Sequence, residues 1–330
     1  EYVVKTLKNA LKNDRTVHAY LFAGPRGTGK TSTAKVFSKA LNCEDESSIE
    51  PCTECENCKK IQSGQSIDVV EIDAASNRGI DEIRELREKV KFYPSEGSYK
   101  VYIIDEVHML TKGAFNALLK TLEEPPENVV FILATTEPHQ VITTILSRCQ
   151  RFDFSLLTVN EIFQRLAFIC KNEDVDYEKD ALNLIAHSSN GGLRDGISIL
   201  DQAISFTDGD LKVEPLTDML GKVDKKILSQ FIKYVINNNT GEALQLVNEL
   251  VEKGKEVSQF VNDLIEHCRQ LLLIKQCGIN SGLLQYSKDR LQLMKKESNA
   301  INNSRLLRMV NILTDIEKDL KFSNQPRLIV

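Results

Sequence analysis

Apolar residues in the first half of the chain form two alternating patterns, short continuous runs and longer stripes with a helical period. The short runs predict strands at 18–23, 67–72, 101–104, 129–133 and 151–154. The stripes predict helices at 1–11, 33–41, 80–90 and 115–122. Strands that alternate with helices indicate an α/β fold with a mainly parallel sheet and helices on both of its faces.

The pattern changes after residue 154, where we expect the strands to stop. The segment Thr158-Val159-Asn160-Glu161 has the spacing of a capping box and predicts a helix start. Two more helices are expected at 180–187 and 193–205, before Gly209 and Pro215 break the pattern. Everything beyond residue 221 is expected to be helical, because apolar stripes run through several turns there.

These changes of pattern divide the chain into three predicted domains. We expect an α/β domain at 1–156, a small helical domain at 157–221 and a helical bundle at 222–330. A chain of 330 residues is long enough for two or three domains with a sizeable core.

The segment between the first predicted strand and the helix after it fits the pattern G-x-x-x-x-G-K-[ST], the phosphate-binding loop of ATP- and GTP-using proteins. Glycines let the backbone wrap so that its amides point at phosphates, and the following helix presents its N-terminus to the anion. A glycine-rich turn that fits the pattern by chance would not need a strand before it and a helix after it. The expected nucleotide-contacting residues are Gly24, Pro25, Arg26, Gly27, Thr28, Gly29, Lys30, Thr31 and Ser32.

Two of these residues have distinct expected roles. Lys30 places a positive charge at the β- and γ-phosphates, and the hydroxyl of Thr31 can ligate Mg²⁺. The predicted strand 101–104 ends in Asp105 and Glu106, at the edge of a parallel sheet where the loop also lies. We expect Asp105 to hold Mg²⁺ and Glu106 to orient the attacking water. Alone, a solvated strand end would explain the two carboxylates better.

Further polar residues are weaker candidates for contact with the nucleotide or the attacking water. Thr135 and Thr136 follow the predicted strand 129–133 and could touch a γ-phosphate or the attacking water, or could simply begin a turn. Arg148 precedes a strand and becomes an arginine-finger candidate only if subunits pack side by side. Arg194 opens a helix and could reach a bound nucleotide, or could pair with Asp195.

Four of the eight cysteines, Cys43, Cys52, Cys55 and Cys58, lie within one short segment with two C-x-x-C steps. Four thiolates with no spare ligand position favour a structural Zn²⁺ site; an iron-sulfur cluster is the alternative, and free thiols are a third interpretation. The remaining cysteines are scattered, and we expect them to fill the core. Cysteines used in this way in a long chain favour a reducing, cytoplasmic location.

Composition narrows the possible partners. The content of 27% charged and 42% hydrophobic residues is typical of a globular protein in water. The net charge of −5 restricts any nucleic-acid surface to a local patch. No apolar run approaches the ~18 residues that a membrane helix needs, and no signal peptide is visible, so we expect no membrane partner.

In this order, the elements resemble AAA+ ATPases of the clamp-loader clade. Ser147-Arg148-Cys149 resembles the Ser-Arg-Cys motif of that clade. The cysteine insertion and the runs Asp105–Leu110 and Lys120–Pro126 closely resemble the tau/gamma subunit family of the bacterial DNA polymerase III clamp loader. The resemblance implies an AAA+ P-loop core with a zinc insertion at about 43–63, a helical lid domain and a helical collar domain.

The resemblance also implies roles. Lys30, Thr31, Asp105 and Glu106 would form the catalytic core of an ATPase. Thr136, with Thr135 as the alternative, would be the first sensor and Arg194 the second. Arg148 would act on ATP held by a neighbouring subunit.

The implied partners are the delta and delta-prime subunits and other copies of the chain, in a ring or spiral held by the collar domain. ATP binding would let this assembly open the sliding clamp and grip primer-template DNA, and hydrolysis would release the closed clamp. Asn77 and Arg78 precede the predicted helix 80–90, where they could hold a DNA phosphate. A plain helix cap explains them equally well.

Three other functions compete with this one. An ATPase-dead scaffold subunit like delta-prime is disfavoured by the intact Lys30-Thr31 and Asp105-Glu106 pairs. Another AAA+ DNA motor, such as a helicase loader or a Holliday-junction motor, is disfavoured by the four-cysteine insertion and the helical third domain. A GTPase is disfavoured because no guanine-reading Asn-Lys-x-Asp segment follows the core strands.

Overall fold

The computed structural model describes residues 2–45, 47–207, 209–279, 286 and 288–322. The chain forms two compact units. The first comprises Glu1–Leu166 and Ala186–Ile199, and the second comprises Ala167–Ile185 and Leu200–Val330. Among the described residues, no helix is both long and apolar enough to cross a membrane.

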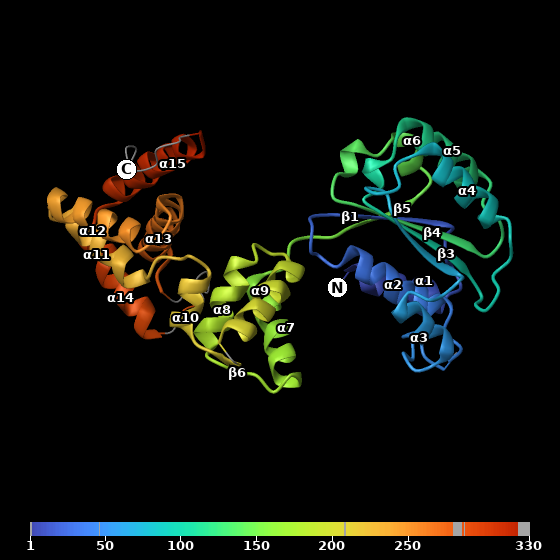
Figure 1. Ribbon diagram of the computed structural model, residues 1–330, viewed down its shortest axis with the longest axis horizontal. Helices are drawn as coiled ribbons and strands as arrows, with labels where there is room; N and C mark the ends of the chain where they lie inside the picture. The colour runs from blue at the N-terminus through green and yellow to red at the C-terminus, as the bar shows by residue number, and fades with distance from the viewer. Residues whose placement is uncertain (1, 46, 208, 280–285, 287, 323–330) are drawn as a thin grey trace. The chain divides into compact units, whose positions relative to one another are not determined.

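A five-stranded sheet organises the first unit (Figure 1). Its strands lie in the order β2-β3-β4-β1-β5, and every neighbouring pair is parallel. The strands are β1 (Ala19–Ala23), β2 (Val69–Asp73), β3 (Lys100–Asp105), β4 (Val129–Thr135) and β5 (Gln150–Asp153). The central strands β1, β3 and β4 are buried on both faces, which explains why they read as continuous apolar runs.

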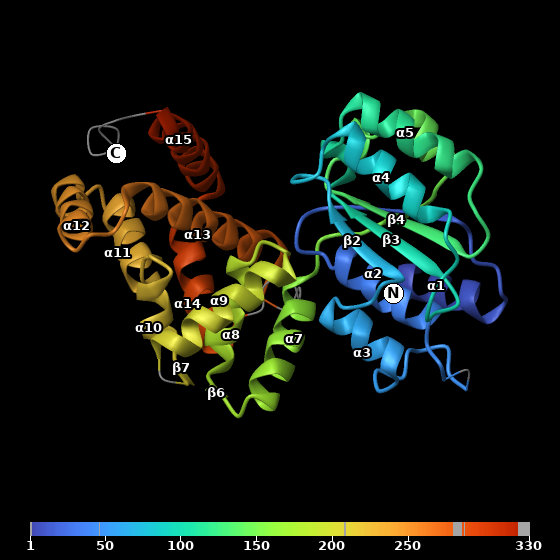
Figure 2. The same ribbon diagram turned by 45° about the vertical axis from the view of Figure 1, so that its right-hand side comes forward.

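Helices cover both faces of this sheet (Figures 1 and 2). One face carries α4 (Ile80–Val90), α5 (Lys112–Glu123) and α6 (Thr143–Leu146). The other carries α1 (Tyr2–Lys12) and α2 (Lys30–Leu41). Two short 3₁₀ segments, η1 (Val107–Met109) and η2 (Pro138–Gln140), follow β3 and β4. The cysteine segment contains α3 (Glu56–Ser63).

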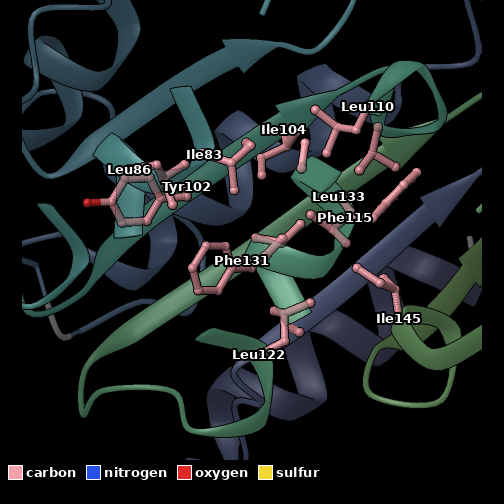
Figure 3. Packing of buried hydrophobic residues seen from close by; sticks show 14 of the residues in the cluster. Ile83, Leu86, Tyr102, Ile104, Leu110, Phe115, Leu122, Phe131, Leu133 and Ile145 are labelled. Atoms are coloured by element: carbon pink, nitrogen blue, oxygen red, sulfur yellow. The ribbon is translucent and has the colours of Figure 1, made fainter. Parts of the chain in front are cut away.

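Side chains alternate between the two apolar layers along each central strand. Tyr102 and Ile104 of β3 face the layer under α4 and α5, whereas Val101 and Ile103 face the layer under α2. Figure 3 shows the first layer, where Tyr102 and Phe131 of adjacent strands stack with ring centroids 5.5 Å apart. This cross-strand pair helps to fix the register of β3 on β4.

The chain after the sheet is almost entirely helical. It comprises α7 (Val159–Asn172), α8 (Lys179–Ser188), α9 (Leu193–Phe206), α10 (Val213–Met219), α11 (Lys225–Ile236), α12 (Thr240–Glu252), α13 (Val257–Cys277), α14 (Lys288–Ala300) and α15 (Asn303–Phe322). In the second unit α14 and α15 pack on the long helix α13, and an apolar core runs through α11 to α15 (Figure 2). The predicted capping box is confirmed, since the Glu161 carboxylate accepts from Thr158 N and Thr158 Oγ1 donates to it at 2.7 Å.

The α/β class, the parallel sheet and its strands are confirmed, but three details of the sequence prediction are wrong and one helix was missed. Strands do not stop after residue 154, because β6 (Asp176–Tyr177) and β7 (Asp210–Leu211) form a two-stranded parallel sheet. Pro215 lies within the first turn of α10, where a helix tolerates proline. The helix α3 was not expected. Cys277 is exposed and fills no core.

Replacing Phe131 by Ala tests the packing of this sheet. The ring is fully buried, so we expect the free energy of unfolding to fall by about 3–5 kcal/mol. Chemical denaturation followed by circular dichroism measures the change. The matched control is Phe92→Ala, whose ring is exposed and whose loss should cost less than about 0.5 kcal/mol. Equal effects of the two variants would contradict the packing described here.

Candidate functional site

The loop between β1 and α2 is held against the ends of neighbouring strands. Gly24 N donates to Thr135 O at 3.1 Å, which ties the loop to β4. Gly24 has φ +150°, and a Cβ there would lie 2.2 Å from the carbonyl oxygen of Phe154, so only glycine fits. The loop leads directly into α2, whose first amides point toward the site.

Lys30 is buried beneath this loop. Its ammonium group donates to the carbonyl oxygens of Gly24 and Pro25, both at 2.8 Å. Burial lowers the pKa of Lys30, and the negative charges of Glu106 and Asp105 oppose that shift. A cation that is largely removed from water next to a helix N-terminus attracts phosphate oxygens strongly.

The end of β3 lies beside the first turn of α2. Thr31 Oγ1 donates to Asp105 Oδ2 at 2.6 Å, so the structure brings together the two residues expected to hold Mg²⁺. Oδ1 of Asp105 accepts from the amide of Glu106 at 2.9 Å. A hydroxyl and a carboxylate are hard oxygen ligands that suit Mg²⁺, and their adjacency fits a metal that is shared with phosphate.

Glu106 follows β3 with a left-handed backbone, φ +48°. Its Oε2 accepts from Thr136 N at 3.3 Å and from Thr136 Oγ1 at 3.0 Å. Thr135 is fully buried, and its hydroxyl oxygen accepts from Glu137 N at 3.0 Å. Of the two candidate threonines, Thr136 therefore contacts the predicted water-orienting carboxylate.

His108 is a residue of this site that the sequence prediction missed. Its Nδ1 lies 3.0 Å from Thr135 Oγ1 and 3.4 Å from Glu106 Oε2. The only signal in the sequence is its position two residues after Glu106. This position matters only because η1 turns the chain and brings the imidazole next to Thr135 at the end of β4.

Arg194 lies close to the phosphate-binding loop within the first unit. Leu193 N donates to Gly27 O at 3.0 Å, and a Cβ on Gly27 would meet Gly192 Cα at 3.2 Å and Arg194 Cβ at 3.5 Å. Gly27 has φ +75°, so glycine is required for this close approach. The carboxylate of Asp195 lies over Gly192, and the described residues include no ion pair between Arg194 and Asp195.

Arg148 lies apart from the loop and is held by its own subunit. Its Nη2 donates to Glu123 Oε1 at 2.7 Å, and its Nη1 donates to Thr144 O at 2.8 Å. The side chain is one-third exposed, so the guanidinium can reach a group on another molecule. A half-exposed ion pair of this kind contributes about 1 kcal/mol or less and is easily exchanged.

Asn77 and Arg78 lie in the turn between β2 and α4. Asn77 Nδ2 donates to Asp73 O at 3.0 Å, and the exposed Arg78 side chain lies 3.7 Å from the sulfur of Met109. The first turn of α4 carries Asp81 and Glu82, whose charges oppose a phosphate at this helix N-terminus. A DNA contact here would therefore depend on Arg78.

The four clustered cysteines come together in space. Their Sγ atoms all lie within 4.8 Å of one another, close to the ~3.8 Å separation of thiolates around a tetrahedral Zn²⁺. Backbone amides donate to three of the sulfurs, from Cys52 to Cys43, from Cys55 to Cys52 and from Cys58 to Cys55. Such amides favour thiolates, and the one toward Cys52 helps to lower the pKa of that thiol to about 7. The four cysteines could therefore hold a metal ion.

Three protein-family models match consecutive parts of the chain. Residues 1–158 match the family model "DNA polymerase III, delta subunit". Residues 161–209 match "DNA polymerase III clamp loader subunit, ATPase lid domain". Residues 211–330 match "DNA polymerase III subunits gamma and tau domain III".

The proteins with similar sequences include tau and gamma subunits of DNA polymerase III. The chain is 49% identical over 328 residues to DNA polymerase III subunit tau of Bacillus subtilis and covers 58% of that protein. It is 33% identical over 329 residues to DNA polymerase III subunit gamma of Buchnera aphidicola, covering 91% of it. It spans about half the length of the tau subunits it matches, 58% in Bacillus subtilis and 43% in Escherichia coli.

Among solved structures, the RuvB Holliday junction branch migration motor of Thermotoga maritima covers 72% of this chain and 76% of its own, with 18% identity and a TM-score of 0.50. This likeness supports the AAA+ fold alone. The fold, the site and the relatives agree, and the chain belongs to the gamma/tau subunit family of the DNA polymerase III clamp loader, an AAA+ family of ATPase type.

Replacing Cys58 by Ser tests the cysteine cluster. Cys58 is the buried member of the four, so we expect the variant to lose bound metal and the unaltered chain to hold about one ion. Elemental analysis after gel filtration measures the metal content of each chain. The matched control is Cys277→Ser, because Cys277 is exposed and lies outside the cluster. Equal metal content in the two variants would contradict a four-thiolate site.

Proposed function

We propose that the chain is the ATP-binding and ATP-hydrolysing motor subunit of a bacterial replicative clamp loader, which opens the sliding clamp and loads it onto primed DNA. One observation carries the proposal. In a chain of the gamma/tau family, hydrogen bonds join Thr31 to Asp105 and Asp105 to Glu106 at the edge of the sheet, and Lys30 is held by loop carbonyl oxygens within reach of the charges of both carboxylates. A scaffold subunit without ATPase activity has no need for this arrangement.

The proposed reaction is attack of water on the γ-phosphoryl group of ATP. A bond forms between the water oxygen and γ-phosphorus while the bond to the leaving β-phosphate oxygen breaks, and ADP and phosphate leave. Loop amides and Lys30 hold the phosphates, and Glu106 orients the water. Thr31 and Asp105 would hold Mg²⁺, which when bound neutralises charge on the phosphates.

The remaining site residues have proposed sensing roles. Thr136 contacts Glu106 and would respond to the γ-phosphate as the first sensor. Arg194 borders the loop through Gly27 and would act as the second sensor. Arg148 would reach ATP held by a neighbouring subunit, because its side chain is partly exposed and its ion pair with Glu123 can be exchanged.

The proposed assembly follows from family membership. We take the partners to be the delta and delta-prime subunits, other copies of this chain, the sliding clamp and primer-template DNA, with the whole acting within a cytoplasmic DNA polymerase III holoenzyme. The three family models match residues 1–158, 161–209 and 211–330, which supports a division into three parts, and we take core, lid and collar to be 1–156, 157–221 and 222–330. Asn77 and Arg78 stay our candidate DNA contacts. The cysteine cluster would hold a structural Zn²⁺, since four thiolates leave no ligand position open.

The deciding experiment measures ATP hydrolysis by the reconstituted assembly with and without clamp and primed DNA. The proposal predicts stimulation when both are present. Turnover that is unchanged by clamp and DNA would contradict clamp loading. Steady turnover by the isolated chain alone would support only a general ATPase.

Replacing Lys30 by Ala should abolish ATP turnover, because the buried ammonium is removed from the phosphate-binding loop. A phosphate-release assay on the assembly measures this. The matched control is Lys35→Ala on the same helix, whose ammonium pairs with Glu71 at the surface and should be dispensable. Full turnover by the Lys30 variant would show that the loop has been assigned wrongly.

Replacing Arg148 by Ala should leave nucleotide binding intact and slow hydrolysis in the assembly by about 10³-fold or more, the range for an arginine finger. Binding of a fluorescent ATP analogue and phosphate release measure the two steps. Arg151→Ala is the control, because Arg151 lies three residues on and pairs with Asp153. If the isolated subunit loses activity by the same factor, Arg148 does not act between subunits.

A further inference from the structure

Two hydrogen-bond donors and one imidazole nitrogen lie around a single oxygen of Glu106. Thr136 supplies its amide and its hydroxyl, and His108 lies 3.4 Å away through Nδ1. Among the described residues, no donor reaches the other carboxylate oxygen, Oε1. The carboxylate is therefore held on one side and open on the other.

The groups around His108 indicate which of its two ring nitrogens carries the proton. An unprotonated Nδ1 could accept from the Thr135 hydroxyl, but its lone pair would then lie beside the Glu106 carboxylate oxygen. A carboxylate is an acceptor only, so an Nδ1 lone pair 3.4 Å from it would be repelled. An Nδ1–H group can donate to Thr135 Oγ1 at 3.0 Å and also attract Glu106 Oε2. The Nδ1–H form is therefore favoured.

The backbone that carries His108 is firmly anchored. Met109 N donates to Glu106 O at 2.8 Å and Leu110 N donates to Val107 O at 3.2 Å, which closes the short turn η1. Val107 and Leu110 on either side are buried in the apolar layer under α5. The His108 side chain itself is only 9% exposed. The imidazole thus has little freedom to turn away from Glu106.

We propose that His108 is a positioning residue for Glu106. Its Nδ1–H donates to Thr135 Oγ1 and attracts Glu106 Oε2 electrostatically from 3.4 Å, which orients the carboxylate so that Oε1 faces the attacking water. Thr135 fixes the imidazole from β4, and Thr136 holds the same carboxylate oxygen from the next residue. The inference rests on the proposed ATPase function, and it assigns to Thr135 a role different from that of Thr136.

The test compares three substitutions in the reconstituted assembly. In His108→Asn the amide Nδ2 takes approximately the place of Nδ1, whereas in His108→Gln the longer side chain carries its amide toward the place of Nε2. His108→Ala removes the donor. We expect His108→Ala to lower kcat by about 10- to 100-fold, the range seen when a group that orients a reacting residue is lost. KM and the binding of a fluorescent ATP analogue should stay unchanged.

The rescue pattern separates positioning from a merely structural role. His108→Asn should recover most of kcat, and His108→Gln should not. Unchanged kcat in His108→Ala would overturn the inference, and so would equal activities of the Asn and Gln variants. If His108→Ala does not fold, as judged by circular dichroism, the comparison of Asn with Gln decides alone.

The same measurements keep the two proposals apart. A wild-type assembly whose ATP turnover does not respond to clamp and DNA contradicts clamp loading, yet its basal turnover still allows the His108 variants to be compared. A normal response in the wild type together with full activity in His108→Ala contradicts only the role of His108.

Discussion

The parallel register of β1, β3 and β4 is the constraint on which the site depends. Parallel strands bring their carboxyl ends to one edge of a sheet, and here Ala23 pairs with Thr135 while Ile104 pairs with Leu133. Gly24 and Thr136 follow directly after β1 and β4, and Asp105 is the last residue of β3. A one-residue slip of β3 on β4 would exchange the two faces of that strand, and the alternating apolar layers oppose such a slip. Packing therefore determines where the polar groups meet.

The site at this edge of the sheet combines buried charges with a strained backbone. A buried ammonium faces two carboxylates, and each desolvated group has protein partners in place of water. Glu106 adopts a left-handed backbone that costs about 1–3 kcal/mol for a residue other than glycine. The hydrogen bonds from Thr136 and the buried residues of η1 hold it there. Such groups are arranged before the substrate arrives, which is how electrostatic catalysis avoids reorganisation.

Much of the fold and the core of the site could be predicted, because their signals are local. The phosphate-binding loop, the strand ending in Asp105 and the cysteine spacing each lie within one short segment. The contacts of Arg148 with Glu123 and of His108 with Thr135 join residues that lie 25 and 27 positions apart, and only the fold brings them together. The strands β6 and β7 were missed because each has only two residues, too few for a period to appear. Pro215 was misjudged because its meaning depends on its place within a helix.

We propose that each ATP is hydrolysed by groups from two subunits, with Arg148 supplied across an interface. Mixing inactive subunits tests this directly. Lys30→Ala chains and Arg148→Ala chains are assembled separately and together, and clamp- and DNA-stimulated phosphate release is measured. The mixed assembly should regain part of the activity, because some interfaces then combine an intact Lys30 with a neighbour's intact Arg148. A mixed assembly as inactive as either pure one would contradict it.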